Sequence, residues 1–207
     1  MPEYHREKIT HKTQIAVWKI TESEAELLNG LALSKHAIDR LSKRKSETHR
    51  KGYLAIRQLL KSFEIDPIAH QYDEHGAPYL TDGRHLSITH TKDIAAIAIS
   101  SVPVGIDLEH YQEKIKKIGP RFLHKKEMTN PKKREEINYL TQVWTAKEAL
   151  YKVFRTPGIH FNTQLYIAPF KEKVTKGKGF IFHQNKTEEY ILYFRYFKGF
   201  CLSLAIT

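Results

Sequence analysis

Hydrophobic and polar positions change period along the chain, and each change predicts an element. In residues 46–63, and again in residues 137–154, apolar side chains recur every three or four positions, the spacing of one helix face. Residues 94–100 and 200–206 are short and almost wholly apolar, which is typical of buried strands. The pattern therefore predicts two long amphipathic helices, each followed later in the chain by a buried strand.

Shorter elements are predicted between these. Thr21 and Glu24 stand at the spacing of a capping box, which indicates a short helix that ends at Gly30. Residues 35–41 are expected to form a further helix. Alternation, apolar runs and turn residues predict strands at 14–20, 70–72, 76–80, 85–89, 94–100, 104–109, 165–168, 180–183, 190–197 and 200–206.

The two halves of the sequence repeat one order of elements. In each half a long helix precedes short strands and a closing hairpin, and residues 90–100 resemble residues 196–207 as a turn that leads into an apolar strand. We predict an α+β fold of two pseudo-symmetric halves, residues 1–103 and 104–207, each a small antiparallel sheet packed on its long helix. The interface of two such halves is where we expect an active site.

The net charge of the chain restricts the classes of partner that it is expected to bind. The chain of 207 residues is 41% hydrophobic and 28% charged, an ordinary soluble composition, but its net charge is +11 and its pI is about 9.6. A basic surface favours polyanions: nucleic acid, a phosphorylated cofactor or an acidic protein. The basic residues are scattered, with local concentrations at 43–45, 114–117 and 132–134, and no motif that reads nucleic acid is evident.

The number of cysteines and the length of the apolar runs indicate in which cellular compartment the protein is expected. A single cysteine, Cys201, excludes an intramolecular disulfide and a Cys-rich zinc site, and it fits a reducing compartment. The first residues are polar, and no apolar run approaches the ~20 residues that a membrane span needs. Among the twelve histidines no metal-ligand pair such as His-x-x-x-His stands out. We expect a cytoplasmic protein without a membrane partner.

One face of the helix predicted at 137–154 carries candidate chemistry. Trp144, Glu148 and Lys152 follow one another at intervals of four residues, so they share that face. The simplest interpretation is an exposed Glu–Lys pair, which stabilises a helix by only about 0.3–0.5 kcal/mol. A second acidic pair upstream in the chain provides the alternative.

That acidic pair is Asp107 and Glu109, two residues apart in a predicted strand, so both carboxylates project to the same side. Such a pair suits a hard cation, and Mg²⁺ needs few carboxylates because it keeps several waters. Glu148 could be a third ligand. The alternative is an edge strand whose acids are simply solvated.

Lysines beside Glu148 are unexpected for a site that binds only a cation. Lys147 and Lys152 make sense if a phosphate also binds, bridged by the metal and neutralised by the lysines. His90, flanked by Thr89 and Thr91, could add donors to that phosphate. The alternative for His90 is an ordinary turn histidine.

Together these residues resemble the 4′-phosphopantetheinyl transferases, in particular the long, monomeric type built from two pseudo-symmetric halves. The resemblance covers roughly residues 40–155 by motif and the whole chain by architecture. The motifs, in the order of the family, are Gly76-x-Pro78-x-Leu80, Ser87-Ile88-Thr89-His90-Thr91, Gly105-Ile106-Asp107-Leu108-Glu109, Arg121-Phe122 with Glu127, and Trp144-x-x-Lys147-Glu148-x-x-x-Lys152.

The resemblance implies a reaction that moves phosphopantetheine from coenzyme A to a serine of an apo carrier protein and releases adenosine 3′,5′-bisphosphate. Asp107, Glu109 and Glu148 would hold Mg²⁺, or Mn²⁺, in the C-terminal half. Glu148, directly or through water, would take the serine proton, and Lys152 would neutralise charge on the phosphate. Fatty-acid, polyketide and nonribosomal-peptide carriers all fit this reaction.

The resemblance also implies contacts to coenzyme A, mainly from the N-terminal half. His90 is expected to be catalytic as well as a phosphate contact. The residues expected to bind coenzyme A are Lys43, Arg44, Arg50, Gly76, Ala77, Pro78, Thr89, His90, Lys147 and Lys152, and Arg57 is a further candidate for its 3′-phosphate. Two departures from the family pattern are Ala77, where a lysine is common, and residues 153–158, which contain less glycine than in many relatives.

The net positive charge would favour encounter with a carrier protein, because carrier proteins are typically acidic. Arg121, Phe122, Lys125 and Lys126 are candidates for carrier docking, and we expect a monomer that binds no nucleic acid. Three alternatives stay open: a basic nucleic-acid-binding protein, a Mg²⁺-dependent phosphohydrolase that activates water, and an inactive relative that only binds.

Overall fold

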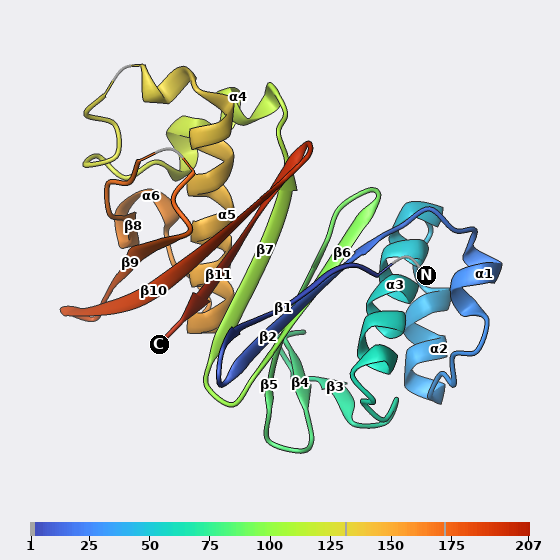
Figure 1. Cartoon of the computed structure of the whole chain (residues 1–207). Helices are drawn as coiled ribbons and strands as arrows, with labels where there is room; N and C mark the ends of the chain where they lie inside the picture. The colour runs from blue at the N-terminus through green and yellow to red at the C-terminus, as the bar shows by residue number, and fades with distance from the viewer. Residues whose placement is uncertain (1–2, 131, 172) are drawn as a thin grey trace. The chain divides into compact units, whose positions relative to one another are not determined.

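The computed structural model describes residues 3–130, 132–171 and 173–207. The chain divides into two compact units, Met1–Val102 and Pro103–Thr207, called unit 1 and unit 2 below (Figure 1). Both combine antiparallel strands with helices, which confirms the predicted α+β class.

Unit 1 contains a four-stranded antiparallel sheet in the order β1-β2-β6-β5 and a small hairpin, β3-β4. Its long helix, α3, lies against β2, β5 and β6. Its elements are β1 (Glu3–Thr10), β2 (Thr13–Lys19), α1 (Glu24–Leu28), α2 (Lys35–Ser42), α3 (Glu47–Ser62), β3 (His70–Tyr72), β4 (Pro78–Leu80), β5 (His85–His90) and β6 (Ile94–Ser100).

The core of unit 1 forms where the apolar stripe of α3 meets the sheet. Leu54 and Leu59 are fully buried on the helix, opposite Ile97 of β6 and Leu86 of β5. Each buried side chain of this size stabilises the fold by about 1.5–3 kcal/mol. The apolar face of α3 and the apolar strand β6 therefore pack against each other in one core.

Unit 2 contains a five-stranded antiparallel sheet in the order β7-β11-β10-β9-β8. Its long helix, α5, lies against β7 and β11 (Figure 1). Its elements are β7 (Val104–His110), α4 (Lys114–Phe122), the 3₁₀ turn η1 (Lys133–Glu135), α5 (Ile137–Phe154), α6 (Phe161–Gln164), β8 (Leu165–Ile167), β9 (Lys176–His183), β10 (Lys186–Phe197) and β11 (Phe200–Ile206).

The two units share a topology. In each, the closing strand returns beside the strand that precedes the long helix, giving β2-β6-β5 in unit 1 and β7-β11-β10 in unit 2. The final hairpin therefore has the same place in both sheets. The core of unit 2 is centred on Leu150 of α5 and Leu192 of β10, which are both fully buried.

Several elements differ from the sequence prediction. The capping box of α1 uses Ser23 and Glu26 rather than Thr21 and Glu24, because Ser23 accepts from the Glu26 amide and Glu26 accepts from the Ser23 amide. Strand β1 was not predicted, since it is half polar and lies at a sheet edge. Helix α4 was not predicted either, and it contains Pro120.

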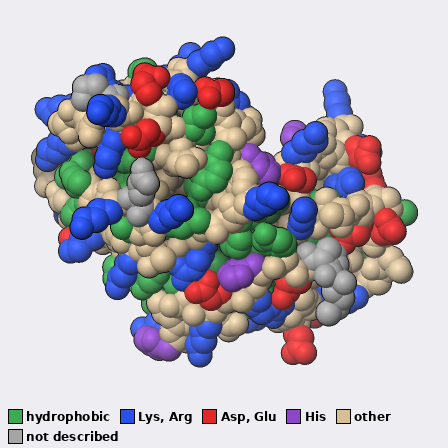
Figure 2. Space-filling view, turned by 45° about the horizontal axis from the view of Figure 1, so that its top comes forward, with side chains coloured by type: hydrophobic (Ala, Val, Ile, Leu, Met, Phe, Trp, Pro, Cys, Tyr) green, Lys and Arg blue, Asp and Glu red, His purple; other side chains and the backbone are tan. Residues whose placement is uncertain are grey.

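Two features of the structure concern possible partners: the distribution of surface charge and the apolar character of the helices. On the face in Figure 2, Lys and Arg side chains lie dispersed among Asp and Glu rather than gathered in one patch. Within residues 3–130, 132–171 and 173–207, no helix has the length and apolar character that a membrane crossing requires.

Candidate functional site

The candidate site in unit 2 is built on the close approach of β7 and α5. Gly105, Asp107 and Glu109 alternate along β7, so all three lie on one side of the strand. A Cβ on Gly105 would overlap the carbonyl oxygen of Ala149 on α5. The glycine therefore lets the strand and the helix touch backbone to backbone, and this brings the next residues on that side close to the helix side chains.

Asp107 and Lys152 form an ion pair across this contact. The Lys152 Nζ donates to Asp107 Oδ1 at 2.7 Å and to the carbonyl oxygen of Ile106 at 3.0 Å. Asp107 is only 6% exposed, so this pair is shielded from water on the carboxylate side. Such a pair contributes more than a fully exposed one, and it fixes the direction of Lys152.

Glu148 lies one helical turn before Lys152 and is half-buried. Burial is the main reason that its pKa rises to about 7, and the negative charges of Asp107 and Glu109 raise it further, whereas Lys152 lowers it. Burial and Asp107 also raise the pKa of Glu109, while Lys114 lowers it. The three carboxylates therefore act on one another electrostatically. At neutral pH Glu148 can both accept and release a proton.

These carboxylates have the oxygen ligands that a hard cation prefers, but they are not arranged as a preformed binding site. Carboxylate oxygens are the ligands that Mg²⁺ prefers, and burial, together with the negative charge of Asp107, raises the pKa of Glu109 and of Glu148. Among the described residues, no group of three or more His, Cys, Asp and Glu side chains is arranged closely enough to hold an ion. Lys152 occupies Asp107 Oδ1, so metal binding would require these side chains to move.

Lys147 has a different place from the one expected. It is fully buried, its Nζ lies 2.8 Å from Glu127 Oε2, and it donates to the carbonyl oxygens of Phe122, Phe161 and Leu165. Burial lowers the pKa of Lys147 to about 8, so the ammonium stays protonated at neutral pH. With every donor used inside the core, Lys147 cannot contact a coenzyme, and the expectation that it binds coenzyme A is wrong.

A cavity of about 650 Å³ opens beside Glu148, between α4, α5 and α6. Its apolar wall includes Trp144, whose ring packs 5.1 Å from that of Phe122 and 5.7 Å from that of Phe161. Arg121 lines the same cavity from α4. Phe122 is 1% exposed, so it cannot dock a partner by its surface, contrary to expectation, although it shapes this cavity.

In unit 1, Thr89 and His90 end strand β5, where they pair with Ala96 and Ala95 of β6. Thr89 is buried. The His90 ring packs on α3 at Gly52, because a Cβ there would lie 2.7 Å from His90 Nδ1, and the ring of His49 lies 6.2 Å away. The absence of a side chain at Gly52 therefore sets the position of the His90 ring.

Gly76, Ala77 and Pro78 form the turn that joins β3 to β4. Asp73 organises this turn, since its Oδ1 accepts from the amides of His75 and Ala77 at 3.0 and 2.8 Å. Gly76 has φ +80°, which favours glycine. The segment is exposed or half-buried, but the amides of Gly76 and Ala77 and the Ala77 carbonyl oxygen are hydrogen-bonded to Asp73 within the turn.

The basic residues expected to bind the 3′-phosphate of coenzyme A differ in whether their charges are already paired with an acid. Lys43 is exposed and pairs with Asp39 at 2.8 Å. Arg50 pairs with Glu24 of α1 at 2.8 Å and donates to the carbonyl oxygens of Arg44 and Lys45, so its charge is already compensated. Arg44 stacks 4.1 Å above the Tyr53 ring without an ion pair to any described acid. Of these three, Arg44 has the charge most available to an anion.

Sequence reasoning missed two residues on which the site depends. Glu127 was recognised only as a motif position, and its pairing with Lys147 depends on a fold contact that no local pattern reveals. Gly105 was read only as the residue before the acidic pair, and its contact with Ala149 has no signal beyond the glycine itself.

Comparisons with known proteins identify a family for this chain. A sequence model described as the 4′-phosphopantetheinyl transferase superfamily matches residues 103–204, nearly all of unit 2. The chain is 29% identical over 163 residues to the 4′-phosphopantetheinyl transferase gsp of Aneurinibacillus migulanus, covering 74% of this chain and 67% of that protein.

A second relative is the 4′-phosphopantetheinyl transferase Sfp of Bacillus subtilis (strain 168), 28% identical over 118 residues, which are 52% of this chain and 53% of Sfp. The chain thus spans about half the length of this relative. The match to gsp extends beyond unit 2, since 163 aligned residues exceed the length of that unit. The resemblance seen in the sequence is confirmed: the chain belongs to the 4′-phosphopantetheinyl transferase superfamily of enzymes.

Proposed function

We propose that the protein transfers the 4′-phosphopantetheine group of coenzyme A to a serine hydroxyl of an apo carrier protein. The observation that carries this proposal is Glu148, whose pKa of about 7 suits a general base, one turn from a lysine held by Asp107. A base and a fixed cation on one helix face are the groups that phosphoryl transfer to a hydroxyl needs.

The reaction forms one bond and breaks one. The serine Oγ attacks the phosphorus that carries pantetheine, and the bond from that phosphorus to the bridging pyrophosphate oxygen breaks. Adenosine 3′,5′-bisphosphate leaves with the electron pair of that bond. Glu148 takes the serine proton, directly or through one water, and Lys152 stabilises the negative charge that develops on the phosphate.

Asp107 has two roles in this proposal. It orients Lys152 through the 2.7 Å ion pair, and its charge helps raise the pKa of Glu148 toward neutrality. Asp107, Glu109 and Glu148 would also hold Mg²⁺, which when bound neutralises charge on the pyrophosphate and organises its oxygens. Lys152, which pairs with Asp107, is proposed to turn from that carboxylate to the substrate phosphate.

Unit 1 is proposed to supply coenzyme contacts. Thr89 and His90 would donate to the phosphates, and His90 would also act during transfer. The turn at 76–78 would receive the adenine edge through its backbone groups, with no lysine at position 77 to add charge. Arg44 is the strongest candidate for the 3′-phosphate, because its charge is not compensated by a described acid.

The carrier serine is proposed to approach Glu148 from the cavity beside it. That cavity is lined mainly by apolar and aromatic side chains, with Arg121 on α4, and Lys125 and Lys126 are exposed just after this helix. An acidic carrier would be attracted by these charges, and the apolar wall would exclude water from the transfer.

The test is incubation with coenzyme A, Mg²⁺ and an apo acyl carrier protein, followed by intact mass measurement of the carrier. We expect a mass gain of one phosphopantetheine on the carrier and release of adenosine 3′,5′-bisphosphate. Glu148→Gln should lower the rate at least 100-fold without changing the circular dichroism spectrum. Glu74→Gln, a change at an exposed acid in unit 1, is the matched control and should retain full rate.

Two results would count against the proposal. Release of the bisphosphate without any carrier would identify a phosphohydrolase that uses water. No mass gain on fatty-acid, polyketide or nonribosomal-peptide carriers, together with salt-sensitive binding to an oligonucleotide, would favour a nucleic-acid-binding protein.

A further inference from the structure

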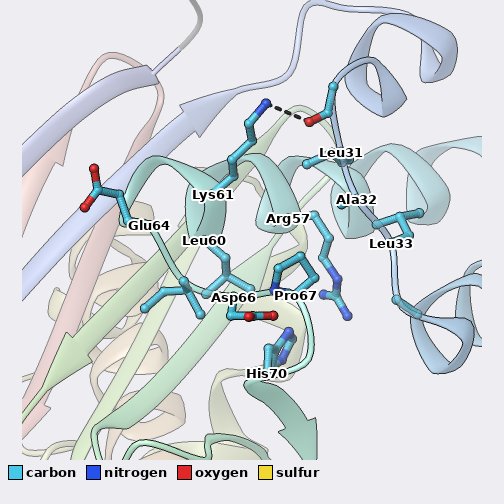
Figure 3. Close-up of a pocket in the computed structure, with 13 residues that line it drawn as sticks. Leu31, Ala32, Leu33, Arg57, Leu60, Lys61, Glu64, Asp66, Pro67 and His70 are labelled. Atoms are coloured by element: carbon cyan, nitrogen blue, oxygen red, sulfur yellow. Dashed lines mark hydrogen bonds between the residues drawn. The ribbon is translucent and has the colours of Figure 1, made fainter.

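A cavity of about 400 Å³ lies in unit 1. It is bounded by the C-terminal half of α3, the segment 30–33, the start of α2 and the segment 64–70 (Figure 3). Leu31, Leu33, Leu60 and Ile65 supply apolar walls. This volume is in the range of pockets that bind small molecules.

Two buried polar side chains line this cavity with unused donors. Arg57 is 8% exposed and His70 is 5% exposed, yet Arg57 Nη1 and His70 Nε2 have no hydrogen-bond partner among the described residues. The other terminal nitrogen of Arg57 donates to the Tyr53 hydroxyl, and the guanidinium stacks 3.8 Å from the Tyr53 ring. Leaving a buried polar atom unpaired costs about 1–3 kcal/mol, more when it is charged.

Figure 3 shows Arg57 and His70 converging from α3 and β3 on the same side of the cavity, next to Pro67. One acceptor placed there could receive hydrogen bonds from both nitrogens, provided that the His70 proton is on Nε2. Each pairing would remove a desolvation cost that the empty site carries.

The field around the two side chains is positive. Arg40 stacks 3.7 Å from the Tyr72 ring and Arg44 lies 4.1 Å from the Tyr53 ring, and neither these two nor Arg57 forms an ion pair with a described acid. Burial, then the charges of Arg57, Arg40 and His36, lowers the pKa of His70 to about 3. The imidazole is therefore neutral, mainly because it is buried, and the positive charges of Arg57 and Arg40 attract an anion.

The acids at the cavity do not cancel this field. Glu64 and Asp66 line the rim but are exposed, and Asp66 Oδ1 already accepts from the Ile68 amide at 2.9 Å. Lys61, also at the rim, donates to the Gly30 carbonyl oxygen at 2.7 Å and so fixes the edge of the cavity.

Of the residues expected to bind coenzyme A, only Arg57, a candidate for the 3′-phosphate, lines this cavity. Gly52 of α3 backs the His90 ring, whereas Arg57 and Lys61 belong to another face of that helix. At about 100° per residue, Arg57 is turned roughly 140° from Gly52 around the helix axis. Neither Thr89, His90 nor the turn at 76–78 lines the cavity.

We propose that this cavity binds a small amphiphilic anion, with an anionic oxygen group accepting hydrogen bonds from Arg57 Nη1 and His70 Nε2 and a short aliphatic body lying against Leu31, Leu33, Leu60 and Ile65. A carboxylate and a phosphate monoester share this chemistry. A ligand with only the anionic group, or with only the aliphatic body, would make only one of these two sets of contacts.

Calorimetric titration with four probes separates these contributions. Hexanoate and hexyl phosphate each combine charge with a chain, 1-hexanol has the chain alone, and inorganic phosphate has the charge alone. We expect one site per chain for at least one of the first two, at least tenfold tighter than for hexanol or inorganic phosphate. Their relative affinity identifies the headgroup, and NMR of the His70 ring should show its resonances shifting with the same affinity.

Two variants and a control locate the site. Arg57→Met should weaken binding at least tenfold, and Ala32→Trp, at an exposed position on the cavity wall, should fill the space without disturbing the core. Arg84→Met removes an exposed arginine paired with Asp82 in the same unit and should leave binding unchanged. Circular dichroism checks that each variant is folded.

Three outcomes would overturn the proposal. They are no saturable binding of either amphiphile, equal binding by folded Ala32→Trp, or competitive displacement of the amphiphile by coenzyme A, which would make the cavity part of the coenzyme site. Phosphopantetheine transfer by Arg57→Met is measured separately. Because the cavity and Glu148 share no residue, failure of one proposal leaves the other intact.

Discussion

Gly105 of β7 lies directly against Ala149 of α5, so closely that a methyl group on the glycine would overlap the Ala149 carbonyl oxygen and crowd the Val153 amide. The neighbours are backbone atoms within a helix and cannot turn aside as a flexible side chain could. Two residues further along β7, Asp107 meets Lys152 at 2.7 Å. A contact between main chains thus sets the distance between the charged groups of the proposed active site.

Gly105→Ala should therefore destabilise unit 2 and weaken the site together. Forcing a methyl group into this contact must part β7 from α5, at a cost of about 1–3 kcal/mol or more. Urea unfolding should show the loss of stability, and phosphopantetheine transfer at a temperature where the variant is folded should be slower. Gly119→Ala is the matched control, because its Cβ would meet only Leu140 and Leu123 side chains at 3.7 and 3.8 Å. Equal stability of both variants would contradict the role of Gly105.

Lys147 provides the second prediction. Lys147→Met leaves the buried carboxylate of Glu127 without its cation, and breaking a buried pair in this way costs about 3–5 kcal/mol. Thermal unfolding should show this loss. Lys43→Met removes the exposed partner of Asp39 and should change stability by no more than about 0.5 kcal/mol.

A double variant separates the charge from the packing of Lys147. Combining Lys147→Met with Glu127→Gln should recover part of the lost stability, because the lone buried charge is gone while the amide oxygen can still accept from one of the two backbone amides that donate to Glu127. If the double variant were less stable by the sum of both single losses, the two residues would not act as a pair.

The contrast between Glu148 and Lys147 shows what the sequence can and cannot predict. Helical spacing correctly grouped Glu148 with Lys152, since residues four apart share a face. Lys147 is adjacent to Glu148 in sequence, but a rotation of about 100° turns it toward the core. Its partner Glu127 lies beyond any local pattern, so a contact between distant residues decided the role of Lys147.

The same limit applies to the fold. The long helices α3 and α5 and the apolar strands β6 and β11 were predictable because burial imposes a clear period on them. Strand β1 alternates half-buried with exposed residues and has few apolar ones, so burial leaves little trace in its sequence. At α1, both Thr21 with Glu24 and Ser23 with Glu26 fit a capping box, and only the structure distinguishes them.

The acidic groups of unit 2 give a metal prediction. Mg²⁺ should raise the melting temperature of the protein after EDTA treatment, because a cation that binds only the folded state stabilises it by RT ln(1 + [Mg²⁺]/Kd). At 100 times Kd this amounts to about 2.7 kcal/mol. Asp107→Asn should abolish the shift, whereas Asp82→Asn, at an exposed acid of unit 1, should retain it. An equal shift in Asp107→Asn would place the cation elsewhere.

The raised pKa of Glu148 makes the stability of the metal-free protein depend on pH. Its pKa is about 7 in the folded chain, against an ordinary value of 4.5. Between these two values the folded state binds more protons than the unfolded state, so stability is greatest below about pH 4.5 and is lost as pH rises through 7. The shift sets an upper limit of roughly 3 kcal/mol on this loss.

Urea unfolding in EDTA at pH 5 and pH 8 tests this sign. Glu148→Gln has no charge to desolvate, so it should lose less stability than the wild type over this interval and be the more stable of the two at pH 8. Glu74→Gln, whose side chain is 86% exposed, should follow the wild type. Glu109 also has a raised pKa, so part of this pH dependence should survive in Glu148→Gln and become smaller when Glu109→Gln is added. A wild-type protein that became more stable from pH 5 to pH 8, relative to Glu148→Gln, would mean that Glu148 is better stabilised as a carboxylate, and would remove it as a base poised near neutrality.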